Sequence, residues 1–91
     1  MLQMPKVISF DNAEEVKQLG RDHIASLQSP IEIDVSAIEQ ANSLAVAILS
    51  AWQRTATLQD KSIVFVNLSQ ELRNIIALSG LDDVLAISPA Q

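Results

Sequence analysis

Ser43 is the residue with the clearest potential for chemistry, because it lies where a strand-like run gives way to an apolar, helix-like run. A nucleophilic serine needs a neighbouring base, and the only histidine in the chain is His23. No Gly-x-Ser-x-Gly turn surrounds Ser43, which also argues against hydrolase chemistry. The remaining roles are helix capping shared with Asn42, phosphorylation, and contact with a partner protein. Spacing alone favours capping, since serine is a common N-cap residue.

The other polar groups do not assemble into a catalytic or metal-binding pattern. His23 is expected to lie half-buried at the edge of the core, and a single histidine cannot build a metal site. The adjacent pairs Glu14-Glu15 and Asp82-Asp83 are typical of a first helical turn and a solvated loop. Only two glycines occur, so the chain has no phosphate-binding loop. We therefore predict a protein that is not an enzyme, with no catalytic residue, metal or cofactor.

A strand and a helix are expected to hold Ser43 at their junction. Residues 31–35 alternate β-branched and acidic side chains, which predicts a strand. Residues 43–57 begin with an apolar run rich in Ala and Leu, which predicts a helix. This helix is apolar on every side for its first two turns, so it belongs in the core or beneath a partner. Trp52 falls on the apolar stripe of this helix, so we expect it to lie in the core. The alternative is that it anchors a protein interface, where tryptophan is enriched.

The rest of the chain continues the alternation of strands and helices. Strands are predicted at residues 7–10 and 62–66, and a short edge strand at 84–87. An amphipathic helix is predicted from about residue 13 to 27, with a capping box formed by Asn12 and Glu15. A third helix is expected to begin after Ser69 and to end at Gly80. The order β-α-β-α-β-α-β predicts an α/β fold with an about four-stranded, mostly parallel sheet and three main helices.

Composition narrows the class of partner. The 91 residues fit a single domain with an ordered core at about 7–87, and 48% of them are hydrophobic. Eleven acidic and six basic residues give a net charge of −5, a poor match for nucleic acid or an anionic membrane. The lack of cysteine fits a reducing compartment, and neither a signal peptide nor a membrane-spanning run is expected. A mean hydropathy of +0.23 indicates either an efficient aliphatic core or an apolar patch covered by another protein, with a homodimer as one arrangement.

The central stretch resembles a STAS domain, the module named for sulfate transporters and anti-sigma factor antagonists. The family pattern joins a strand ending in Asp-Leu-Ser to an Asp-Ser or Asp-Thr pair, two small residues and an apolar helix. The matching residues here are Asp34-Val35-Ser36 and Asn42-Ser43-Leu44-Ala45-Val46. Residues 72–85 are similar to the family's last helix and loop, and the resemblance covers about residues 7–87. In this chain Asn42 replaces the acid, Leu44 and Ala45 replace smaller residues, and the family's first strand is not found.

This resemblance implies a protein-interaction domain whose site lies at the start of the second helix, where Ser43 matches the family's phosphorylatable or partner-contacting Ser/Thr. The chain is most similar to stand-alone MlaB-like members. That similarity implies a cytoplasmic domain, peripheral at the inner membrane, that binds and regulates the ATPase of an ABC-type phospholipid transporter. The alternative is an anti-sigma factor antagonist whose kinase-like partner phosphorylates Ser43. The residues expected at the site are Asn42, Ser43, Leu44, Ala45 and Val46, with Ser36 and Trp52 as further interface candidates.

Overall fold

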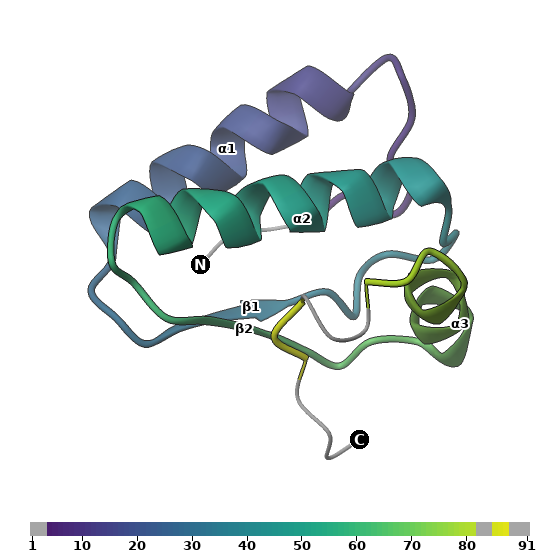
Figure 1. The fold of residues 1–91 in the computed structure, drawn as a ribbon. Coiled ribbons are helices and arrows are strands. Elements are labelled where there is room, and N and C mark those ends of the chain that lie inside the picture. Colours follow the sequence, from purple (N-terminus) through teal and green to yellow (C-terminus); the bar gives the residue numbers. More distant parts are fainter. Residues whose placement is uncertain (1–3, 82–84, 88–91) are drawn as a thin grey trace.

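The chain forms an α/β fold in the computed structural model, which describes residues 4–81 and 85–87. Figure 1 shows α1 and α2 side by side over one face of a small sheet, with α3 near the end at which α2 begins. The elements are α1 (Ala13–Ser26), β1 (Ile31–Asp34), α2 (Ser43–Leu58), β2 (Ile63–Val66) and α3 (Gln70–Leu78). All three predicted helices are confirmed, each close to its expected bounds.

Among the described residues the sheet consists of β1 and β2, and these strands run parallel, as the alternation of strands and helices predicts. Ile31 pairs with Ile63 at one end of the ladder, and Asp34 pairs with Val66 at the other. Every second side chain of each strand is buried, which is the period expected where one face of a sheet covers the core. Both strands point their carboxyl ends toward the start of α2 (Figure 1).

The predicted four-stranded sheet is not confirmed among the described residues. Near the C-terminus, Ile87 makes one isolated parallel bridge to Phe65. The Phe65 N–H supports this bridge by donating to the Ala86 carbonyl at 2.8 Å. Val84, where the expected edge strand begins, and the acidic pair before it lie outside the described residues.

The predicted strand at residues 7–10 is reduced to a single parallel bridge between Val7 and Gln40. The Lys6 carbonyl accepts from the N–H groups of Glu39 and Gln40, at 2.8 and 3.4 Å. The N-terminal segment therefore pairs with the loop that precedes α2 instead of joining the sheet, and it lies beside the expected site.

α2 is the centre of the core, as its apolar sequence indicates. Trp52 is fully buried, and its Nε1–H donates to the Lys17 carbonyl of α1 at 3.0 Å. The indole ring lies against the backbone of α1 at Gly20, where a Cβ would overlap it. The close approach of the two helices therefore requires a glycine at this position. The buried residues of α2 are Ala45, Val46, Ile48, Leu49, Ala51, Trp52 and Ala56.

Both predicted boundaries of α3 are confirmed by their hydrogen bonds. Ser69 is the N-cap, and its Oγ accepts from the Leu72 N–H at 3.1 Å. After the helix, Gly80 adopts the left-handed conformation with a φ of 73°. The N–H of Gly80 and that of the next residue donate back to carbonyls of the last helical turn. This pair of bonds is the Schellman arrangement, which favours glycine at that position.

Candidate functional site

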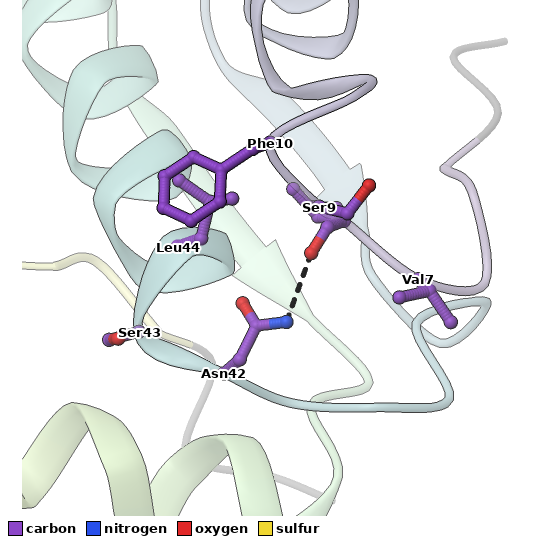
Figure 2. A pocket seen from close by; sticks show the side chains of 7 residues that line it. Val7, Ser9, Phe10, Asn42, Ser43 and Leu44 are labelled. Atoms are coloured by element: carbon purple, nitrogen blue, oxygen red, sulfur yellow. Dashed lines mark hydrogen bonds between the residues drawn. The ribbon is translucent and has the colours of Figure 1, made fainter.

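Asn42 fixes the end of α2 where the sequence predicts the site. It is the N-cap residue, and its Oδ1 accepts from the Ala45 N–H at 2.8 Å. Its Nδ2 donates to the Ile8 carbonyl at 3.0 Å, so one side chain caps the helix and holds the N-terminal segment (Figure 2). Ser43 is the first helical residue and not the cap, so the capping role expected for Ser43 is wrong. Asparagine suits this position because an ionised aspartate would have no N–H to offer Ile8.

Asn42→Asp is expected to lower the free energy of unfolding by about 0.5–1 kcal/mol although it preserves the helix cap. The carboxylate would still accept from the Ala45 N–H, but it could no longer donate to the Ile8 carbonyl. Asn42→Ala loses both bonds and should cost about 2 kcal/mol. Urea unfolding of the three proteins measures these differences. An aspartate variant as stable as the wild type would show that the bond to Ile8 contributes nothing.

A second asparagine, Asn12, shapes the turn at residues 7–12. Its Oδ1 accepts from the Ser9 N–H and its Nδ2 donates to the Val7 carbonyl, both at 2.9 Å. The side chain makes no capping bond to α1, so the predicted capping box is wrong. The turn is held by Asn12 on one side and by Asn42 on the other, and it presents Phe10 in a defined place.

A pocket of about 330 Å³ lies between this turn and the start of α2. Phe10 and Leu44 both line it, and Figure 2 shows the Ser43 side chain pointing away from them. Phe10 is 91% exposed, whereas the other two aromatic residues, Trp52 and Phe65, are completely buried. Phe10 was not predicted to belong to the site, because residues 7–10 were predicted to form a strand. The available signal was an aromatic residue directly before a polar turn.

The structure brings only part of the expected site to the surface. Ser43 is exposed, its hydroxyl makes no hydrogen bond to another described residue, and Leu44 is half-buried. Ala45 and Val46 lie in the core, so neither side chain can reach a partner in this conformation. Trp52 is also buried, which confirms the prediction that it belongs to the core. Its side chain is therefore not exposed to act as an interface anchor.

A second group of polar side chains lies at the carboxyl ends of the two strands. Asp34 ends β1, and its Oδ1 accepts from the N–H of the exposed interface candidate Ser36 at 2.9 Å. Hydrogen bonds from the backbone and side chain of Ser36, and from the Asn67 side chain, hold the pKa of Asp34 below its ordinary value of 3.8. Asn67 follows β2 with a left-handed φ of 62°, which asparagine tolerates better than most residues. Ser36 therefore serves the turn after β1.

Asp34→Asn is expected to lower stability at neutral pH and to flatten its decline in acid. Because the pKa is lower in the folded state, the ionised carboxylate stabilises the fold above its ordinary pKa, and this contribution is lost as the pH falls through the folded-state value. The difference in urea midpoint between wild type and variant should be largest at about pH 7 and shrink by about pH 2. Glu32→Gln removes the same charge from an exposed position on β1 and serves as the control. Parallel pH profiles for wild type and Asp34→Asn would contradict this assignment.

Within the described residues, no group of three or more His, Cys, Asp or Glu residues comes together to hold a metal. His23 is half-buried in the last turn of α1, whereas Ser43 begins α2. The two helices start at the same end of the molecule (Figure 1), so these side chains lie at opposite ends of the pair and cannot form a nucleophile and its base. No helix in the part of the chain that the structure describes is long and apolar enough to cross a membrane.

The sequence matches the family model described as Mlab, STAS domain, over residues 2–87. This chain belongs to the STAS domain family. The matched residues include both paired helices, the sheet and the start of α2 with its pocket. STAS domains are protein-interaction and regulatory domains and not typical enzymes. No curated protein matches this STAS domain significantly.

A solved structure supports the fold of this STAS domain. It is a candidate anti-sigma factor antagonist from Thermotoga maritima, with a TM-score of 0.78 and 17% sequence identity. The superposition covers 94% of this chain and 74% of that chain. At this identity the likeness establishes the shared α/β STAS fold.

Proposed function

We propose that this STAS domain binds and regulates the ATPase subunit of an ABC-type, Mla-like phospholipid transporter through the start of α2. The contact surface, called here the α2 N-terminal surface, consists of Val7, Phe10, Asn42, Ser43 and Leu44. The observation that carries the proposal is an almost fully exposed Phe10 that shares a pocket with the exposed Ser43. The Mlab description of the matching family supports this class of partner.

Phe10 has the properties of an interface anchor. Aromatic side chains bury about 150–250 Å² each, and removing apolar area from water contributes about 25 cal/mol per Å². The turn that carries Phe10 is already fixed by Asn12 and Asn42, so little conformational entropy would be lost on binding. Aromatic residues, phenylalanine included, are enriched in the buried centre of protein interfaces, which supports this role for Phe10.

In this proposal the domain acts by contact and not by chemistry. The Ser43 hydroxyl would donate a hydrogen bond to the ATPase, and Phe10 and Leu44 would supply apolar contact to one side of it. The domain would work in the cytoplasm and would be held peripherally at the inner membrane by the ATPase. Binding to one conformation of the ATPase would then stabilise that conformation.

A second candidate function is anti-sigma factor antagonism, with Ser43 as the phosphate acceptor for a kinase-like anti-sigma factor. Ser43 is the first residue of α2, where free backbone N–H groups and the helix dipole stabilise added negative charge. Its hydroxyl is exposed, so a kinase could reach it. The fold shared with a candidate antagonist also favours this function.

Copurification from a lysate of the source cells identifies the class of partner. We expect the wild-type domain to retain an ABC-type ATPase and Phe10→Ala to lose it by about tenfold or more. Leu58→Ala is the matched control, since this side chain is 87% exposed at the other end of α2 and should leave binding unchanged.

Two other outcomes would redirect the proposal. Retention of a kinase-like anti-sigma factor instead, with a mass gain of one phosphate on the domain after incubation with ATP, would establish the second candidate. Equal retention of the ABC-type ATPase by wild type and Phe10→Ala would show that the partner binds elsewhere on the domain.

A further inference from the structure

We infer that Asn42 is a positioning residue, which sets the place of Phe10 relative to Ser43 and so prepares the α2 N-terminal surface for its partner. In this role Asn42 acts through the hydrogen bond from its Nδ2 to the Ile8 carbonyl, two residues before Phe10. The inference rests on the proposed function, since it concerns the same surface. It adds the internal bond on which the arrangement of that surface depends.

The pocket at this surface has two walls that come from different parts of the chain. One wall is the turn at residues 7–12, and the other is the start of α2 with its cap. Among the described residues, the bond from Asn42 to Ile8 is the only hydrogen bond between the two walls (Figure 2). Both of these residues line the pocket, so the bond restrains the distance between its walls.

Internal hydrogen bonds make the turn that carries Phe10 a single unit. The Asn12 side chain accepts from the Ser9 N–H and donates to the Val7 carbonyl, and the Asn12 N–H donates to the Ser9 carbonyl at 3.2 Å. Ile8 lies between the two bonded residues and is buried, whereas Phe10 is almost fully exposed. A displacement of the Ile8 carbonyl therefore displaces Phe10 as well.

The other end of the Asn42 side chain is fixed to α2. Its Oδ1 accepts from the Ala45 N–H at 2.8 Å, and Ala45 is completely buried. Asn42 itself is half-buried, so water competes less for its two hydrogen bonds than it would at an exposed position. One planar amide group therefore connects the helix end that carries Ser43 to the turn that carries Phe10.

This connection affects binding through the fraction of molecules in which both contact residues are correctly placed. The apparent affinity of a protein falls in proportion to the fraction that is competent to bind. If loss of the bond leaves Phe10 in its bound position in about one-fifth of the molecules, the affinity for the ATPase falls about fivefold. The contacts made in the complex would themselves be unchanged.

Asn42→Ser tests this role without adding charge. Serine is as good an N-cap as asparagine, but its side chain is shorter and should not reach the Ile8 carbonyl. In the isotope-labelled domain, we expect the NMR order parameters of the Ser9 and Phe10 backbone amides to fall from about 0.85 to below about 0.6. The order parameter of the Ala45 amide should stay high because the cap is retained.

Asn74→Ser is the matched control, since it removes an exposed amide of α3 that does not line the pocket. It should change neither the order parameters of the turn nor the affinity. A purely structural role of Asn42 would lower the free energy of unfolding without loosening the turn in the folded protein. Unchanged order at Phe10 in Asn42→Ser, or an equal loss of order in both variants, would overturn the inference.

Calorimetric titration of a purified ABC-type ATPase connects this positioning role to binding. Asn42→Ser should bind about fivefold more weakly than the wild type. In the Phe10→Ala background the same substitution should change the affinity by less than about twofold, because the side chain that Asn42 positions is gone. An equal loss in both backgrounds would overturn the inference. If the wild type does not bind the ATPase, the proposed function fails, and the order parameters alone decide the positioning role.

Discussion

Replacing Gly20 with alanine is expected to destabilise the domain by about 2–3 kcal/mol, even though alanine is the better helix former by about 1 kcal/mol. The added Cβ would overlap Cε2, Nε1 and Cζ2 of the Trp52 indole. The ring has no room to move, because it is fully buried and its Nε1–H is bound to the Lys17 carbonyl at 3.0 Å. α1 must therefore shift away from α2. Small domains have a total stability of about 5–15 kcal/mol, so this loss is a large share of it.

Thermal unfolding followed by circular dichroism measures this effect, and we expect the Tm to fall by about 10–20 °C. Gly80→Ala is the control, since no atom lies within 4 Å of its added Cβ. Its cost comes from the left-handed φ of 73° alone and should be about 1 kcal/mol. Trp52→Phe removes the overlapping indole atoms, so its combination with Gly20→Ala should cost less than the sum of the single variants. A Gly20→Ala protein with the wild-type Tm would contradict the packing of α1 on α2.

Ser43→Asp is expected to weaken binding of the partner by about 100-fold while the domain stays folded. The side chain is exposed at the first residue of α2, so the new carboxylate interacts favourably with the helix dipole and should stabilise the isolated domain by about 0.3–1 kcal/mol. In the complex the same carboxylate would be removed from water beside an apolar pocket. An uncompensated charge in an interface costs about 2–5 kcal/mol. Stability and affinity should therefore change in opposite directions.

Two controls accompany this variant. Gln28→Glu adds the same charge at an exposed position after α1, at the other end of the helix pair, and should not alter binding. Ser43→Ala removes the hydroxyl without adding charge and should weaken binding by only about tenfold, as expected for one lost hydrogen bond. A lower Tm for Ser43→Asp would show that the effect on binding comes from damage to α2.

The sequence predicts the fold best where a residue type has one dominant local use. Ser69 and Gly80 mark the two ends of α3 because their hydrogen bonds go to residues within one helical turn. The roles of Asn12 and Asn42 are harder to predict, because a side-chain amide can also form hydrogen bonds with residues far away in the sequence. Nδ2 of Asn42 donates to a residue 34 positions away, and the side chain of Asn12 reaches back to the preceding turn. The residue spacings typical of helix caps therefore do not predict these hydrogen bonds.

The candidate site was predictable only in part, for reasons of geometry. Consecutive residues of a helix point about 100° apart, so a run of five motif residues cannot all face a partner. Ser43 lies outside, whereas Ala45 and Val46 lie in the core. Phe10 joins the pocket from a segment more than thirty residues earlier in the chain, and only the tertiary structure brings it to α2. Trp52 was correctly assigned to the core because it follows the apolar stripe of its own helix.

Calorimetric titration of a purified ABC-type transporter ATPase with the wild-type domain and with Ser43→Asp tests the central claim most directly. The account predicts saturable binding of the wild type, an affinity lower by about 100-fold for the variant, and an unchanged or higher Tm for the variant alone. If the wild type does not bind, or if both proteins bind with the same affinity, the α2 N-terminal surface is not the contact with this ATPase.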